Sequence, residues 1–131
     1  MRALLVESAA SRELYIVEFL SVRDVPCPRV EEGQARVRVK AAGIGFVEAL
    51  KIAGRYQTKD PLPFVPGTEF ASVVEEVGHG VAWPKIGERV FGIAQRGALA
   101  EEICVGAEGL LRIPDRLSLP RRLTIRPRCM D

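Results

Sequence analysis

The sequence is poor in the residues on which metal sites and nucleophilic active sites depend. It holds one histidine, His79, and three widely spaced cysteines with no CxxC pair. A zinc site or a nucleophile–base pair needs several such residues within reach of one another, and an odd, dispersed set of cysteines does not predict a disulfide scaffold. We therefore interpret His79, which stands between two glycines, as a surface turn residue. We interpret the cysteines as thiols of a protein in a reducing cytoplasm.

A long hydrophobic run is also absent. Charged residues interrupt the first twenty positions, so the sequence predicts neither a signal peptide nor a membrane-spanning helix, and we expect a cytoplasmic protein without a membrane partner. The net charge of +2 depends on four arginines within residues 121–131, where no aromatic residue accompanies them. A nucleic-acid interface combines basic residues with stacking aromatics on a folded face. We therefore expect no nucleic-acid partner.

Short strands separated by turns account for most of the pattern that is present. Residues 35–41 alternate between apolar and basic side chains, which is typical of a half-buried strand. Twelve glycines and nine prolines supply many turn signals. Further strands are predicted at residues 2–7, 13–20, 69–77, 88–93, 98–105 and 110–113. The pattern predicts a mainly β fold, a barrel or a sandwich, with one or two short helices.

One short helix is predicted from Phe46 to Ala53. Phe46, Leu50 and Ala53 fall on one helical face at spacings of four and three, which predicts that this face is apolar. Gly54 would end the helix as a C-cap glycine. Prolines then exclude regular structure from a loop at residues 61–66.

Two glycine pairs invite comparison with a phosphate-binding loop. They lie at residues 43–45 and 78–80, and the first stands between a predicted strand and the predicted helix. The dinucleotide-binding pattern needs a third glycine three residues later, where helix and strand pack closely. Glu48 and Trp83 occupy those positions, so we interpret both pairs as turn glycines.

Six short segments share their order and spacing with one enzyme family. They are residues 37–43, 54–56, 63–67, 74–78, 87–90 and 100–102. Through them the chain resembles the zinc-free quinone oxidoreductase branch of the medium-chain dehydrogenase/reductase superfamily. The resemblance implies that residues 1–120 form a GroES-like β-barrel, the alcohol dehydrogenase-like N-terminal domain, without the Rossmann domain. Residues 121–131 would form a tail foreign to the family.

The same resemblance argues against zinc. The zinc enzymes of the superfamily carry a ligand cysteine at the position of Gly45 and a ligand histidine at the position of Thr68. A catalytic zinc site needs three protein ligands, so two would be missing here. We expect no metal.

The family transfers a hydride from NADPH to a quinone or a conjugated enone, in a cleft between this barrel and the Rossmann domain. The resemblance therefore implies NADP(H) as cofactor, with Gly45, Tyr56 and Thr68 beside it. It also implies a substrate pocket lined by Tyr56, Phe46 and Leu50. The family often has asparagine and tyrosine where this chain has Gly45 and Leu50. Because neither of these two residues offers a polar side-chain contact, the pocket of this chain would fit a bulky apolar substrate better.

Two positions within this resemblance have more than one interpretation. The Tyr56 phenol could donate a hydrogen bond to a substrate oxygen or border the nicotinamide, or its ring could simply cover the end of the helix. Phe46 could form a pocket wall or belong to the core. Ser72 replaces a glycine at which the family packs backbone closely. No residue is predicted to be catalytic.

The resemblance ends near Pro120. There the family continues with an alanine-rich helix and the Rossmann fold, whereas residues 121–131 show neither helical nor strand periodicity. We expect a foreign or out-of-frame end to a longer gene. On this hypothesis the chain does not hold NADP(H) alone and is inactive without the missing coenzyme domain or a partner chain. The alternative is a stand-alone GroES-like binding or assembly module that associates through the proline loop.

Overall fold

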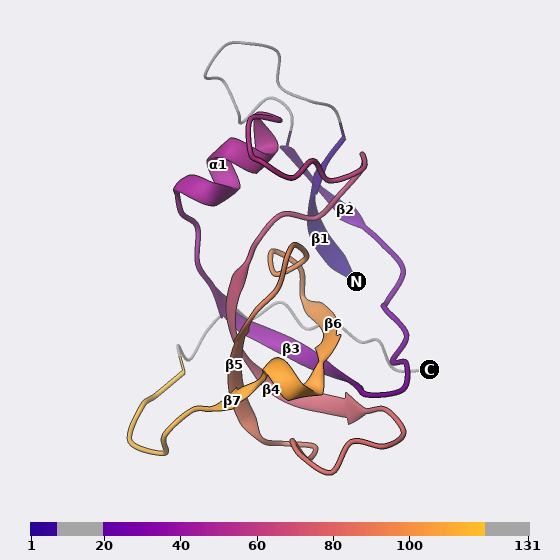
Figure 1. Ribbon diagram of the computed structural model, residues 1–131, viewed down its shortest axis with the longest axis vertical. Coiled ribbons are helices and arrows are strands. Elements are labelled where there is room, and N and C mark those ends of the chain that lie inside the picture. Colours follow the sequence, from indigo (N-terminus) through magenta and orange to yellow (C-terminus); the bar gives the residue numbers. More distant parts are fainter. Residues whose placement is uncertain (8–19, 120–131) are drawn as a thin grey trace.

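Two antiparallel sheets and one helix make up the part of the chain that the computed structural model describes, residues 1–7 and 20–119 (Figure 1). The strand predicted at residues 13–20 and the tail at 121–131 fall, apart from Leu20, outside those residues. Among the described residues, no helix is long and apolar enough to cross a membrane.

The larger sheet has five strands in the order β6-β3-β4-β5-β7. Its members are β3 (Gln34–Ala42), β4 (Glu69–Val77), β5 (Arg89–Ile93), β6 (Glu102–Gly106) and β7 (Leu111–Arg112). The smaller sheet pairs β1 (Arg2–Val6) with β2 (Leu20–Asp24). Isolated bridges pair β1 with Phe64, in the loop before β4, and with Ala100, in the loop before β6. Because both loops lead into strands of the larger sheet, the bridges connect the two sheets. The remaining elements of the described structure are a 3-10 turn (Ala107–Gly109) and the helix α1 (Phe46–Ile52). Strands therefore predominate, which confirms the prediction of a mainly β fold.

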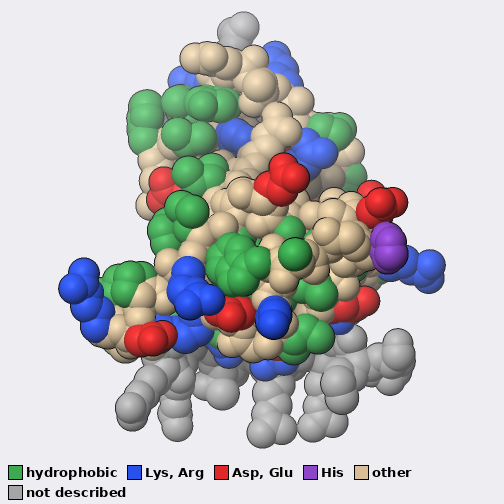
Figure 2. Space-filling view, turned by 60° about the horizontal axis from the view of Figure 1, so that its bottom comes forward, with side chains coloured by type: hydrophobic (Ala, Val, Ile, Leu, Met, Phe, Trp, Pro, Cys, Tyr) green, Lys and Arg blue, Asp and Glu red, His purple; other side chains and the backbone are tan. Residues whose placement is uncertain are grey.

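The alternation predicted along β3 is confirmed in the first half of the strand. Ala35 and Val37 are completely buried and belong to the main core, whereas Arg36 and Arg38 form ion pairs with acidic residues of β4. From Val39 to Ala42 every residue is half-buried. This core lies within the five-stranded sheet, and a second, smaller cluster joins β1 to α1 through Val6, Ile52 and Phe64. On the face drawn in Figure 2, acidic and basic side chains are interspersed with hydrophobic ones.

Three expectations need correction. The strand predicted at residues 98–105 is shorter, because residues 98 and 99 hydrogen-bond to the Pro66–Gly67 backbone before β6 begins at Glu102. Cys27 is disulfide-bonded whereas Cys104 is free, so the interpretation of the cysteines as thiols is wrong for Cys27.

The third correction concerns the buried face of α1. The helix buries Glu48, Lys51 and Ile52, whereas Phe46 is 77% exposed. The core alternative for Phe46 is therefore wrong. The two charged side chains are buried because they meet polar partners in loops far along the chain, which outweighs the simple apolar spacing.

Candidate functional site

A buried carboxylate joins the start of α1 to the loop before β4. Glu48 is 3% exposed, and its Oε2 accepts a hydrogen bond from the Gly45 N–H at 2.7 Å. Its Oε1 accepts one from the Thr68 hydroxyl at 2.5 Å and one from the Thr68 N–H at 3.2 Å. We call this arrangement the Glu48 bridge. It brings together two positions, Gly45 and Thr68, at which the sequence predicted cofactor contacts.

The electrostatics of the bridge follow from those hydrogen bonds. Burial alone raises the pKa of Glu48, but hydrogen bonds from the Thr68 hydroxyl and from nearby backbone N–H groups outweigh it and hold the pKa below its ordinary value of 4.5. Glu48 is therefore a stable anion at neutral pH. It fixes the backbone on both sides of the site without needing a counter-cation.

A second buried charge lies one helical turn later on the same face of α1, since residues three apart are neighbours on a helix. The Lys51 ammonium donates to the backbone carbonyl of Gln95 and lies 3.6 Å from the Asp60 carboxylate. Asp60 also accepts from Arg96 at 2.7 Å. The Tyr56 ring lies over the ammonium, with its centroid 5.5 Å from Nζ.

Exposed apolar side chains surround the Glu48 bridge. Ile44 and Phe46, on either side of Gly45, are 78% and 77% exposed, and Ile93 at the end of β5 is 79% exposed. Sheet register places Ile93 opposite Glu69, next to Thr68, and Gly43 donates its N–H to the Glu69 carbonyl. These residues therefore lie at one end of the sheet, where α1, β4 and β5 meet.

The structure thus separates the predicted site residues into two groups. Gly45 and Thr68 share the Glu48 bridge, and Phe46 projects from the first turn of α1 beside them. Tyr56 lies at the other end of α1 against Lys51, and Leu50 is half-buried within the helix. The position of the Tyr56 ring agrees with the interpretation that it covers the helix end.

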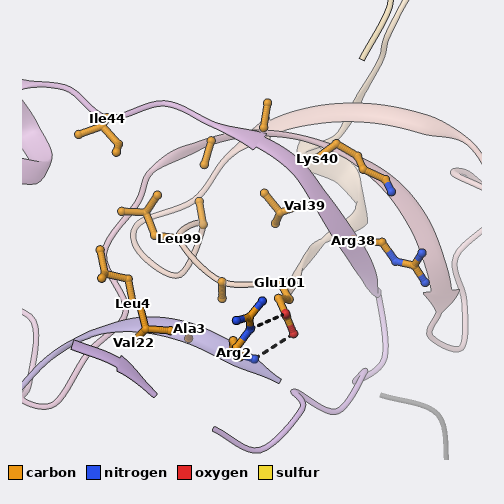
Figure 3. Close-up of a pocket in the computed structure, with 14 residues that line it drawn as sticks. Arg2, Ala3, Leu4, Val22, Arg38, Val39, Lys40, Ile44, Leu99 and Glu101 are labelled. Atoms are coloured by element: carbon orange, nitrogen blue, oxygen red, sulfur yellow. Dashed lines mark hydrogen bonds and ion pairs between the residues drawn. The ribbon is translucent and has the colours of Figure 1, made fainter. Parts of the chain in front are cut away.

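A cavity of about 330 Å³ lies between β1, β2 and the second half of β3, and Ile44, next to Gly45, forms part of its lining (Figure 3). Its wall is mostly apolar and includes Leu4, Val22, Val39 and Leu99, and Arg2 pairs with Glu101 at one end. None of the five predicted site residues lines it. We assign the candidate site to the polar cluster at α1, because there a buried charge joins two of the predicted site residues, Gly45 and Thr68.

Sequence reasoning missed the two buried charges of α1. In the sequence, Glu48 stood out only because it occupies the position of the third glycine in the dinucleotide-binding pattern. A carboxylate three positions after a helix start is a capping signal, and that spacing could have identified it. Lys51 gave no comparable signal, because its partners lie 9 and 44 residues further along the chain.

His79 is exposed in the turn after β4, which confirms that it is a surface turn residue. Residues 1–7 and 20–119 contain no group of three or more histidine, cysteine, aspartate or glutamate side chains placed to hold a metal ion.

Comparisons with known proteins identify the fold. A family described as the alcohol dehydrogenase GroES-like domain matches residues 31–115. The mouse quinone oxidoreductase-like protein 2 is 39% identical over 100 residues, which cover 76% of this chain and 29% of that protein. The chain therefore spans less than a third of that relative's length.

Solved structures agree with this assignment. A human synaptic vesicle membrane protein VAT-1 homolog-like structure matches with a TM-score of 0.84 at 29% identity, covering 91% of this chain and 37% of the other. The Escherichia coli quinone oxidoreductase, solved in complex with NADPH, matches with a TM-score of 0.81 at 26% identity and covers 91% and 35%. Together these matches confirm the predicted GroES-like architecture.

Proposed function

The chain belongs to the alcohol dehydrogenase GroES-like domain family, as a quinone oxidoreductase-like member of the medium-chain dehydrogenase/reductase superfamily, and from that premise we propose that it forms the substrate-side wall of an NADPH-dependent quinone or enone reductase. In this proposal the end of the sheet around the Glu48 bridge faces the acceptor. The coenzyme would be held by a domain that lies outside residues 1–119.

The Glu48 bridge is the observation that carries the proposal. It is a buried, fully hydrogen-bonded anion that holds the Gly45 and Thr68 backbones in fixed positions. Exposed Ile44 and Phe46 stand directly beside it. A rigid backbone with apolar side chains around it suits a planar, apolar acceptor, because ring packing and water exclusion can hold the ring in one orientation.

The residues of this chain fit one part of the cofactor. A nicotinamide ring could pack against the exposed backbone of Gly45 and against Phe46. The pyrophosphate would find no cradle, because the glycine turn between β3 and α1 has Glu48 in place of the third glycine of the dinucleotide-binding pattern, and its Gly45 N–H already donates to Glu48. NADPH, when bound, supplies the hydride. The chain's own contribution is to orient the acceptor and exclude water from it.

We propose that zinc takes no part. The Gly45 side chain offers no ligand atom, and the Thr68 hydroxyl donates a hydrogen bond to Glu48. A threonine hydroxyl held in this way is a poor substitute for the histidine or cysteine ligands that zinc prefers.

A chimera tests the proposal. Residues 1–119 would replace the corresponding N-terminal region of the mouse quinone oxidoreductase-like protein 2, so that the coenzyme domain comes from the relative. We expect quinone-dependent NADPH oxidation by the chimera and none by the 131-residue chain alone. A folded chimera that binds NADPH but reduces no quinone or enone would contradict the proposal, as would turnover by the chain alone.

A further inference from the structure

The proposed function leaves the apolar cavity between β1, β2 and β3 without a role. Its volume of about 330 Å³ lies at the lower end of the range in which proteins bind small molecules. Most of its lining residues are hydrophobic, and alanine is the most frequent type among them, so short side chains leave the space open. Val22, on its wall, is 65% exposed. The cavity is therefore reached from the surface.

The charged residues of the lining are paired or directed elsewhere. The Arg2 N–H donates to Glu101 Oε2 at 2.9 Å, and the two side chains form an ion pair at 3.4 Å. Arg38 pairs with Glu75 at 2.7 Å, and Figure 3 shows Arg38 and Lys40 projecting away from the apolar side chains of the cavity. Buried polar groups of a sugar or a phosphate need hydrogen bonds. The cavity therefore favours a hydrocarbon over either of them.

The cavity adjoins the Glu48 bridge on two sides. Ile44, which forms part of the lining, directly precedes Gly45 and is 78% exposed. Leu99, another lining residue, donates its N–H to the Pro66 carbonyl at 2.9 Å, two residues before Thr68. Ile44 thus belongs both to the cavity and to the apolar surface beside the Glu48 bridge. A ligand at the bridge has a continuous apolar path into the cavity.

We propose that the cavity holds a hydrocarbon side chain of the acceptor, so that the substrate is a quinone or enone with a short alkyl or prenyl tail. The ring lies beside the Glu48 bridge, and the tail passes Ile44 into the cavity. The small volume suits a short tail, and a long polyprenyl chain would extend beyond it into solvent. This inference rests on the proposed function, because the ring must lie at the bridge for its tail to reach the cavity.

Two naphthoquinones that differ only in their tail test the proposal by titration of the 131-residue chain. One carries a methyl group and the other a butyl group, which adds three methylene groups. Each methylene that enters an apolar site should tighten binding about three- to fourfold. We therefore expect the butyl compound to bind about thirty- to sixtyfold more tightly. Equal dissociation constants for the two compounds would overturn the proposal.

Variants of the lining separate entry into the cavity from non-specific adsorption of the tail. Val22→Asp places a charge on the exposed wall, and Leu4→Trp fills the cavity from β1. Both should remove most of the gain for the butyl compound and leave the affinity for the methyl compound unchanged. Leu111→Asp, at an apolar strand position that is 58% exposed and lies outside the cavity lining, should preserve the gain. A gain that survives Val22→Asp overturns the proposal, even if Leu4→Trp does not fold.

A probe without a ring distinguishes failure of this inference from failure of the proposed function. Hexanol, titrated into the ¹⁵N-labelled chain, should shift the amide signals of Leu4, Val22 and Leu99 and leave those of Phe46 and Thr68 unchanged. If hexanol binds in this way but neither quinone binds, the cavity accepts hydrocarbon and the proposed function is contradicted. If the methyl compound binds at Thr68 while hexanol shifts none of the cavity signals and the butyl group adds no affinity, the proposed function stands and the tail site is overturned.

Discussion

At the scale of single residues, the site depends on charges that are buried but satisfied. The Glu48 carboxylate accepts three hydrogen bonds, from the Gly45 N–H, the Thr68 N–H and the Thr68 hydroxyl. Hydrogen bonds to a charged group contribute more than those between neutral groups. By contrast, the buried hydroxyl of Ser72 has no hydrogen-bond partner among the described residues.

Glu48→Gln tests the bridge. The native pKa is lowered below 4.5, so the stability that ionised Glu48 contributes is present above that pH and is lost as the pH falls through the folded-state pKa. We expect the variant to lose about 2 kcal/mol of the free energy of unfolding at pH 7. The difference between the two proteins should shrink as the pH falls below 4.5.

Urea unfolding at several pH values between 7 and 3 measures this effect. Glu108→Gln, at an exposed position with the same change of charge, serves as the control. A pH-independent difference between Glu48→Gln and the native chain would mean that the carboxylate is not the group that matters.

Ser72→Ala should stabilise the chain. The Ser72 side chain is completely buried in β4, and its hydroxyl has no hydrogen-bond partner in the described structure. Removing an unsatisfied buried hydroxyl recovers its desolvation cost, so we expect a gain of about 1 kcal/mol in the free energy of unfolding. Ser21→Ala, at a half-buried position where the hydroxyl accepts from Arg23, should give no such gain. Destabilisation by Ser72→Ala would show that the hydroxyl is satisfied after all.

At the scale of elements, the loop that presents Thr68 is held by a close approach of two backbones. Gly67 has φ +106°, and a Cβ added there would lie 2.7 Å from the Leu99 nitrogen. Two hydrogen bonds join the same two segments: the Leu99 N–H donates to the Pro66 carbonyl, and the Ala98 N–H donates to the Gly67 carbonyl. Only glycine allows this contact together with that φ.

Gly67→Ala should therefore be more damaging than Gly80→Ala. Both positions have positive φ, but an added Cβ at Gly80 meets nothing within 4 Å. Each variant bears a backbone strain of about 1–2 kcal/mol, and Gly67→Ala adds a steric overlap of about 1–3 kcal/mol. Thermal or urea unfolding measures the difference. Equal losses in the two variants would contradict the close approach.

The elements also show where sequence reasoning succeeds and where it stops. β3 and the position of α1 were predictable, because alternation and a short apolar repeat are local signals, and Gly54 follows α1 with φ +68° as a C-cap glycine should. The burial of Lys51 was not predictable. Its hydrogen-bond partner lies 44 residues away, and no local pattern encodes such a partner.

At the scale of the whole molecule, we propose that the described fold is one half of a two-sided site. The structural match with the Escherichia coli quinone oxidoreductase covers 91% of this chain but only 35% of that protein. Exposed Ile44, Phe46 and Ile93 gather at the end of the sheet that carries the Glu48 bridge. This arrangement supports our proposal that a coenzyme domain covers that end during catalysis.

The most direct test of this proposal is to map where a quinone binds. The measurement is a titration of the ¹⁵N-labelled 131-residue chain with a naphthoquinone, followed through its amide NMR signals. We predict that the largest changes occur at Gly45, Phe46 and Thr68, around the Glu48 bridge. Changes confined to the far side of the apolar cavity, at Leu4, Val22 and Leu99, would contradict the assignment of the substrate wall to this end of the sheet.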